Sequence, residues 1–116
     1  MSTAKKPDIG ADDFLAVDMR VGRVLEVEAF PEARKPAWKL TVDFGPAVGT
    51  LRTSAQVTSY RAEELVGRLV VGAINLGTKR IAGFTSQFLI LGSIDSDGRV
   101  RLLQPEPGVS PGDPIA

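Results

Sequence analysis

Cysteine and histidine are both missing from this 116-residue chain. Without cysteine there is no disulfide, no thiolate to ligate a metal ion and no thiol nucleophile. Without histidine the chain lacks the side chain that most often acts as a general base or a zinc ligand, so Ser-His and Cys-His nucleophile pairs are excluded. We therefore expect a protein that binds rather than catalyses, with no cofactor and no metal site.

An excess of charge of either sign is also lacking, because 14 basic residues balance 14 acidic ones. Nucleic-acid-binding proteins usually carry a basic surplus, so any such binding here depends on local clusters. Charged residues or glycine interrupt every apolar run before it reaches the length of a membrane span. No apolar segment follows the lysines near the N-terminus, so we expect a cytoplasmic protein that does not insert into membranes.

The length of the chain predicts one domain with one hydrophobic core. Residues 1–10 are polar and contain proline and glycine, so we expect a flexible tail ahead of a domain over residues 11–116. Residues 11–17 predict one short helical turn, with Phe14 and Val17 facing inward.

Alternating apolar and polar residues predict β-strands over most of the remaining chain. The isolated Gly22 in the long first strand predicts a bulge or sharp bend, and Gly67 predicts the end of a helix. The predicted elements are strands at 18–28, 38–44 and 48–55, a helix at 61–66, a strand at 68–75, a basic loop at 77–84, a strand at 86–94 and a turn at 96–98 before a last strand at 99–103. This order predicts an all-β, five-stranded OB-fold barrel with a short helix between strands three and four and an extra C-terminal hairpin and tail.

Six basic residues are predicted to converge on one face of this barrel. In an OB fold, the face of strands two and three and the loops that border it form the usual ligand groove. The basic residues at this face are Arg34, Lys35, Lys39, Arg52, Lys79 and Arg80. They could hold the phosphates of an unpaired nucleic-acid strand, and dispersed surface charge is an equally weighted alternative.

Aromatic and small polar residues near the same face allow two interpretations each. For Phe44, Leu89 and Leu91, core packing is the prediction. For Trp38, Phe84 and Phe88, an exposed patch at a subunit or peptide interface is a real alternative. Three polar residues could hydrogen-bond a ligand or could cap their own turns, and these are Ser54, Gln56 and Ser86.

Several runs of the sequence resemble the tRNA-binding domain appended to bacterial methionyl-tRNA synthetases, from about Asp12 to Gln104. The similar runs are Asp13-Phe14 followed by VDMRVG at 17–22, KLTVDFG at 39–45, Tyr60 followed by EELVGR at 63–68, and the segment from Asn75-Leu76 through Lys79-Arg80 to Gly83 and Ser86. Within this superfamily the chain is most similar to the stand-alone CsaA group of secretion chaperones. That likeness is carried by FPEARKPA at 30–37, SAQVT at 54–58 and RIAGF at 80–84.

The resemblance implies an OB-fold homodimer, without catalysis or cofactor, that binds unfolded or presecretory polypeptides during protein export. Its groove would have Phe30, Trp38, Phe84 and Phe88 as an apolar floor and the basic residues as a rim. The alternative is a tRNA-binding module, in which the same basic residues, with Ser54, Gln56 and Ser86, contact RNA. Phe88-Leu89 stands where the tRNA-binding domains usually carry a Gly-Met pair, and this change favours a polypeptide groove.

Overall fold

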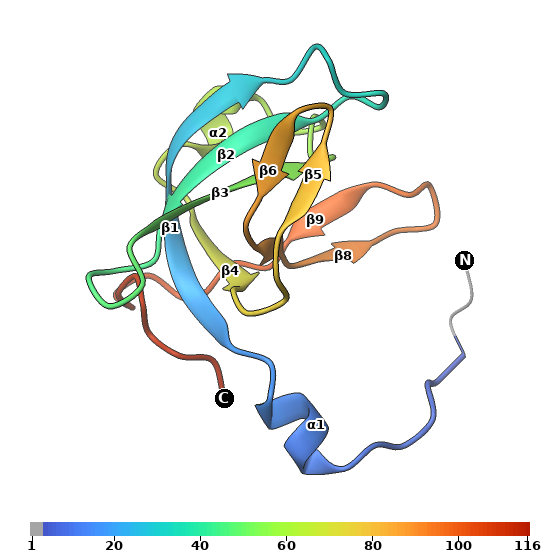
Figure 1. The fold of residues 1–116 in the computed structure, drawn as a ribbon, viewed down its shortest axis with the longest axis vertical. Helices are drawn as coiled ribbons and strands as arrows, with labels where there is room; N and C mark the ends of the chain where they lie inside the picture. The colour runs from blue at the N-terminus through green and yellow to red at the C-terminus, as the bar shows by residue number, and fades with distance from the viewer. Residues whose placement is uncertain (1–3) are drawn as a thin grey trace.

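The long first strand belongs to two sides of the barrel. In the computed structural model, which describes residues 4–116, β1 (Met19–Ala29) pairs antiparallel with two different strands (Figure 1). Its first half pairs with β4 (Leu69–Ala73), and its second half pairs with β2 (Trp38–Asp43). Arg23 is the residue at which the two pairings meet. A strand that changes partner along its length is what allows a small sheet to curl into a barrel.

The other strands extend this sheet at both ends until it nearly closes. β3 (Thr50–Ala55) pairs with β2, and β7 (Leu89–Ile90) pairs with β4, which gives the order β3-β2-β1-β4-β7. Hydrogen bonds link β3 to the segment just before β7: the Gln87 amide donates to the Arg52 carbonyl over 2.8 Å, and the Thr53 hydroxyl donates to the Phe88 carbonyl over 2.7 Å. The predicted five-stranded OB-fold barrel is therefore confirmed.

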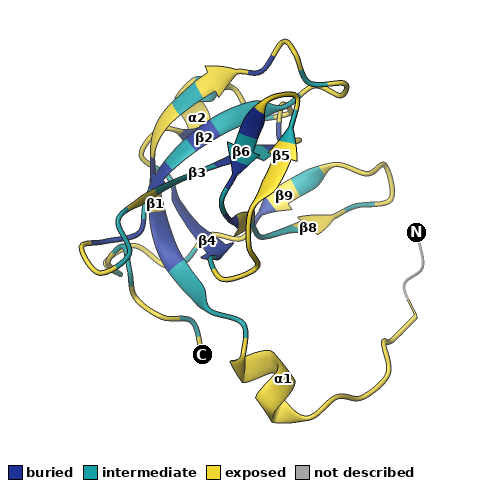
Figure 2. Ribbon diagram, viewed as in Figure 1, coloured by how far each residue is buried: buried dark blue, intermediate teal, exposed yellow. Residues whose placement is uncertain are grey.

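The core of the barrel follows the period-two pattern of the strands. Leu40 and Val42 point inward from β2 and are fully buried, and β4 is buried along its whole length (Figure 2). The Phe44 and Phe88 rings meet edge to face, with centroids 4.8 Å apart. They can do so only because residue 72 is glycine, since a Cβ there would lie 2.7 Å from the Phe44 ring and 2.8 Å from the Phe88 ring. Close packing of this kind leaves no room for an extra methyl group.

Close packing of neighbouring side chains also requires a glycine at position 22 in β1. A Cβ on Gly22 would lie 2.5 Å from Cγ1 of Val42 and 2.8 Å from the Phe44 ring. The bulge predicted at this residue occurs instead at Leu25, where the pairing with β2 shifts between Val24 and Glu26. The prediction from Gly22 was wrong because close approach of side chains, rather than strand geometry, requires the glycine.

The helix α2 (Ala62–Leu65) closes one end of the barrel between β3 and β4. Leu65 is fully buried, and Glu64 accepts the amide hydrogen of Arg61 over 2.8 Å at the start of the helix. Gly67 follows the helix with a φ of 85°, and its amide donates to the Val24 carbonyl. The predicted helix and its glycine stop are both present.

Two hairpins project from the barrel. The predicted basic loop at 77–84 is in fact a hairpin of β5 (Lys79–Ile81) and β6 (Phe84–Ser86), so the loop prediction was wrong. Ala82 and Gly83 form its two-residue turn with φ values of 47° and 82°, a conformation that matches the twist of paired strands. The predicted strand at 86–94 is divided between β6, β7 and β8 (Gly92–Ile94), and β8 pairs with β9 (Val100–Leu102) in the predicted C-terminal hairpin.

The C-terminal tail returns to the barrel and covers a free strand edge. β2 pairs with β1 only from Arg23 onward, so the start of β1 has an open edge on that side. The Gly112 amide donates to the Val21 carbonyl over 2.8 Å, the Val21 amide donates to the Asp113 carbonyl over 2.9 Å, and the Ile115 amide donates to the Met19 carbonyl over 2.9 Å. The extended tail therefore protects an edge that could otherwise pair with another chain.

The N-terminal segment behaves differently from the prediction. α1 (Ala11–Leu15) stands away from the barrel and has no buried residue (Figures 1 and 2). Phe14 is 46% exposed, so the expectation that it faces inward was wrong: no described segment covers it. Residues 1–3 of the predicted tail lie outside the described residues. No helix within residues 4–116 is long and apolar enough to cross a membrane.

Candidate functional site

The outward face of β2 and β3 carries polar and basic side chains. Because successive strand residues point to opposite sides, Leu40 and Val42 fill the core while Lys39 and Thr41 face out. In the register of the two strands, Lys39 lies opposite Ser54 and Thr41 lies opposite Arg52. Lys39, Arg52 and Ser54, which were predicted for this face, therefore lie there because of the alternation of the strands.

The β5–β6 hairpin lies against the edge of this face (Figure 1). The Ser54 amide donates to the Ser86 hydroxyl oxygen over 3.0 Å, and the two serine hydroxyl oxygens are 3.2 Å apart. Ser54 and Ser86 therefore bind each other, which fixes the hairpin on the barrel. Each hydroxyl still has unused hydrogen-bonding capacity for a ligand.

Two aromatic rings and two cations form a cluster beneath the hairpin. Phe30 and Phe84 meet edge to face at 5.6 Å, and both are buried. The Lys39 ammonium group lies 4.8 Å from the Phe30 ring centroid and 5.4 Å from that of Phe84, and the Arg52 guanidinium group lies 4.9 Å from the Phe84 centroid. Such contacts hold a cation over a ring with about 0.5–2 kcal/mol each. Arg52 is also fixed by an ion pair with Glu28 at 3.1 Å.

This cluster changes the role expected of the aromatic residues. The alternative of an exposed patch at Phe84 and Phe88 is wrong, because these rings are only 8% and 5% exposed. Trp38 is half-buried, and its indole N–H donates to the Tyr60 carbonyl over 3.0 Å. Neither Phe84 nor Phe88 presents a free face on which a nucleic-acid base could stack.

Two hollows flank the hairpin, and Ile81 lines both of them. The first has a volume of about 200 Å³ and is walled by Ala33, Ala37 and Ile81, with Phe30 at its base. The second has a volume of about 240 Å³ and is walled by Leu76, Leu89 and Ile81, with Phe88 at its base. We refer to them as the Ala33 hollow and the Leu76 hollow, and together as the groove. Their walls are mainly aliphatic.

Most of the predicted site residues border the groove. The Ala33 hollow is lined by Phe30, Arg34, Lys35, Ser54 and Gln56, and the Leu76 hollow by Lys79, Ser86 and Phe88. Lys39 and Arg52 sit on the adjoining aromatic cluster. Trp38, Phe84 and Arg80 line neither hollow, and Arg80 instead donates to the Thr85 hydroxyl over 2.8 Å.

The apolar walls were missed in the sequence. Leu89 was predicted to lie in the core but is 53% exposed, and Leu76 is 56% exposed. β7 is only two residues long, so the inward alternation that would bury Leu89 in a longer strand does not apply. Ile81 lay within the segment predicted as a loop, and only the hairpin pairing places it between the two hollows.

A third, larger hollow of about 450 Å³ continues from the groove toward the β8–β9 hairpin. It shares Gln56 with the Ala33 hollow and Leu89 with the Leu76 hollow, and it reaches Ile94 and Val100. The three hollows therefore share lining residues and lie beside one another on this side of the barrel. Among residues 4–116 no group of three or more acidic side chains is placed to hold a metal ion.

Comparison with known proteins identifies the family. The model of the family described as "Putative tRNA binding domain" matches residues 19–114, which cover the barrel, both hairpins and most of the tail. The chain belongs to this tRNA-binding domain family. The family likeness predicted from the sequence is thereby confirmed.

Two solved structures that this chain covers in full are similar to it. The CsaA chaperone protein from Picrophilus torridus is 45% identical, with a TM-score of 0.89 over 94% of this chain and 100% of that one. The chaperone CsaA from Bacillus anthracis is 41% identical, with a TM-score of 0.89 over 95% of this chain and 100% of that one.

The chain is also similar to parts of longer proteins. A methionine–tRNA ligase from Porphyromonas gingivalis is 38% identical over 108 residues, which are 93% of this chain but 16% of the ligase. The chain therefore spans about a sixth of the length of the ligases that it matches.

Proposed function

We propose that this protein is a non-enzymatic, chaperone-like factor that binds unfolded or presecretory polypeptides in its groove. The observation that carries the proposal is the pair of aliphatic hollows that meet at Ile81 beneath a basic rim. An extended chain places alternate side chains on the same side, so two of its apolar residues can enter the two hollows. The likeness to the CsaA chaperones over their full length supports this function.

The chemistry of the groove explains how such binding would operate. Burial of apolar side chains supplies the affinity at roughly 25 cal/mol per Å² before the cost of ordering the bound segment. Because the hollows are shallow and open, we expect fast release. The serine hydroxyls and Gln56 can bond to the backbone of any segment, so they add affinity without demanding a particular sequence. We propose that this binding occurs in the cytoplasm and serves protein export.

RNA binding is the second candidate, because the family model describes a tRNA-binding domain and the groove has a basic rim. Lys79 and Arg80 on the hairpin, with Arg34 and Lys35 across the Ala33 hollow, would bind phosphates of tRNA. Affinity of this type falls steeply with salt because counterions are displaced from the RNA. Affinity for an apolar peptide changes little with salt.

One titration series separates the two candidates. Nuclease-treated protein is titrated with total tRNA and with a labelled, unstructured segment of a presecretory protein at several salt concentrations. The proposal expects peptide binding that varies little with salt. Tight tRNA binding with a steep salt dependence, together with no peptide binding, would contradict it and leave the RNA candidate. The double variant Lys79→Ala, Arg80→Ala should abolish RNA binding and only weaken peptide binding.

A pair of matched variants tests the groove itself. Ile81→Ser removes the one aliphatic side chain shared by both hollows, and Val66→Ser removes a 52% exposed aliphatic side chain at the end of α2, away from the groove. Burial of such a side chain contributes about 1.5–3 kcal/mol, so Ile81→Ser should weaken peptide binding about tenfold or more. Val66→Ser should bind as the unaltered protein does. Equal affinities for the two variants would place the peptide elsewhere.

We also propose a homodimer in which α1 contributes to the interface. Ile9 and Leu15 are 69% and 70% exposed, and Phe14 is 46% exposed, so an apolar strip stands free of its own barrel. Contact with a second copy would bury this strip. Sedimentation should show a mass of two chains at micromolar concentration, and Phe14→Ser with Leu15→Ser should give one. A single-chain mass for the unaltered protein would contradict the proposal.

A further inference from the structure

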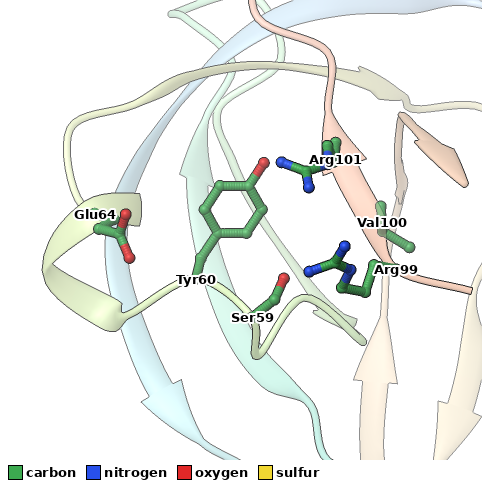
Figure 3. Close-up of a pocket in the computed structure, with 6 residues that line it drawn as sticks. All are labelled: Ser59, Tyr60, Glu64, Arg99, Val100 and Arg101. Atoms are coloured by element: carbon green, nitrogen blue, oxygen red, sulfur yellow. The ribbon is translucent and has the colours of Figure 1, made fainter. Parts of the chain in front are cut away.

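A polar hollow of about 210 Å³ lies between α2 and β9, separate from the groove (Figure 3). Its walls are formed by Ser59 and Tyr60 on one side and by Arg99 and Arg101 on the other. We call it the Tyr60 hollow. It shares Val100 with the large hollow that continues from the groove, so the two depressions adjoin.

The hydroxyl groups of the Tyr60 hollow can donate hydrogen bonds. The Tyr60 hydroxyl oxygen accepts the Leu102 amide hydrogen over 3.1 Å, which fixes the oxygen in place. A phenol carries one donor hydrogen in addition to its acceptor sites, so the Tyr60 O–H remains free to donate. Within residues 4–116 no hydrogen bond occupies the Ser59 hydroxyl. Both hydroxyl groups are therefore free to donate a hydrogen bond to an acceptor in the hollow.

Arginine side chains lie along the wall of the Tyr60 hollow that β9 forms. The Arg101 guanidinium group points toward the Tyr60 hydroxyl (Figure 3), and no carboxylate among the described residues pairs with it. Arg68 stacks on the Tyr60 ring with its guanidinium carbon 4.9 Å from the centroid, and it is held there by hydrogen bonds to the Glu64 carbonyl and the Gln104 side chain and by attraction to the Glu64 carboxylate. Arg99 forms ion pairs with two carboxylates, with Asp95 at 3.3 Å and with Asp97 at 4.0 Å, which offset its charge, while its N–H groups that make no hydrogen bond can still donate.

The one carboxylate that lines the hollow, that of Glu64, is separated from Arg99 and Arg101. Glu64 lies on the α2 side of the Tyr60 ring, and the ring stands between it and the guanidinium groups of Arg99 and Arg101 (Figure 3). Its carboxylate accepts the Arg61 amide hydrogen over 2.8 Å. That bond lowers the pKa of Glu64, so the group stays charged and engaged with Arg61 at neutral pH.

We propose that the Tyr60 hollow binds a phosphate of an RNA backbone through Arg101, Arg99, Tyr60 and Ser59. Guanidinium and hydroxyl donors that converge from several directions suit a tetrahedral phosphate better than a planar carboxylate. The Tyr60 hollow and the large hollow share Val100, so an RNA strand bound in the groove has the Tyr60 hollow nearby. The inference rests on the RNA-binding candidate above, and it adds a contact outside the groove.

The test measures binding of a fluorescein-labelled, mixed-sequence single-stranded RNA at several salt concentrations. The variants are Arg101→Gln, Ser59→Ala and, as a control of equal charge loss on the exposed N-terminal segment, Lys6→Gln. One phosphate contact on a single strand contributes about 0.7 to the salt slope, so Arg101→Gln should weaken binding about eightfold near 50 mM salt and reduce the slope by that amount. Ser59→Ala should weaken binding about tenfold with an unchanged slope, because it removes a hydrogen bond from an uncharged donor to the anionic phosphate.

The outcomes separate this inference from the proposed functions. An Arg101→Gln variant that binds RNA as Lys6→Gln does overturns the inference. If Lys79→Ala, Arg80→Ala abolishes RNA binding at the same time, the RNA candidate is retained. Unaltered protein that binds the presecretory peptide but no RNA overturns both the RNA candidate and this inference, and leaves the polypeptide proposal in place. Peptide binding by Arg101→Gln should equal that of the unaltered protein, which shows that the variant is folded.

Discussion

Substitution of Gly72 by alanine tests the packing that positions the groove. The new Cβ would lie 2.7 Å from the Phe44 ring and 2.8 Å from the Phe88 ring, whereas ordinary carbon contacts begin near 3.5 Å. The Phe44 ring is fully buried in the core, so it has no space into which it could move away from the new Cβ. Phe88 forms the base of the Leu76 hollow, so its ring should move toward the groove.

The expected loss of stability follows from two opposed terms. Overpacking of a dense core costs about 1–3 kcal/mol, while alanine restricts the unfolded chain and returns about 0.4–1 kcal/mol. We therefore expect the free energy of unfolding to fall by about 1–2 kcal/mol and the Tm by about 3–8 °C. Urea denaturation followed by the fluorescence of Trp38, the one tryptophan of the chain, measures the change.

The control is Gly10→Ala, because a Cβ at Gly10 meets nothing within 4 Å. It should leave the free energy of unfolding within about 0.5 kcal/mol of the unaltered protein. A double variant that adds Phe88→Leu to Gly72→Ala should cost less than the sum of the single variants by about 1 kcal/mol, since the smaller side chain relieves one of the two contacts. If Gly72→Ala is as stable as Gly10→Ala, or if the double variant is additive, the described ring packing is incorrect.

Three further changes address other parts of the barrel. Ala82→Asn should raise the free energy of unfolding, measured by urea denaturation, by about 0.5–1 kcal/mol, because asparagine adopts the left-handed conformation of this turn more readily than alanine does. An unchanged free energy of unfolding would contradict the turn geometry. Removal of residues 111–116 breaks three backbone hydrogen bonds to β1, so the free energy of unfolding should fall by about 2 kcal/mol. The exposed edge of β1 should also promote self-association, which light scattering detects. A truncated protein that is monodisperse and equally stable would contradict this prediction. The hydrogen bond from the Arg99 amide, and then that from the Asp97 amide, lower the pKa of Asp95. The charged Asp95 carboxylate therefore stabilises the β8–β9 turn at neutral pH, and this stabilisation is lost as the pH falls below about 4. Amide NMR signals of the turn should change over that pH range, and in Asp95→Asn this pH-dependent change should be absent.

The alternation of the strands made most of the barrel predictable. β1, β2, β3, α2 and β4 all occur near their predicted positions, since each has a regular apolar pattern and a glycine or proline boundary. The β5–β6 hairpin could not be predicted in the same way, because its Ala82-Gly83 turn lacks the Asn-Gly or Asp-Gly signal and its strands are only three residues long. Short strands carry too few residues for a period to be detected.

The chemistry of the site was easier to predict than its exposure. Basic and hydroxyl residues lie at the expected face because OB-fold geometry and strand parity place them there. The aromatic rings were misjudged, because the burial of Phe84 depends on Phe30 and on Arg52, which come from distant parts of the chain. The apolar walls at Leu76 and Leu89 are visible only once the barrel is closed. Tertiary contacts of this kind have no local signature in a sequence.

The proposed polypeptide-binding site is the groove formed by the Ala33 and Leu76 hollows, and an NMR titration of ¹⁵N-labelled protein with the unstructured presecretory segment tests it most directly. The largest shifts should occur at the amides of Ala33, Gln56, Leu76 and Ile81, and those of Val66 and Ser59 should stay unchanged. Shifts confined to α1 or to the Tyr60 hollow, or no shifts at saturating peptide, would contradict it.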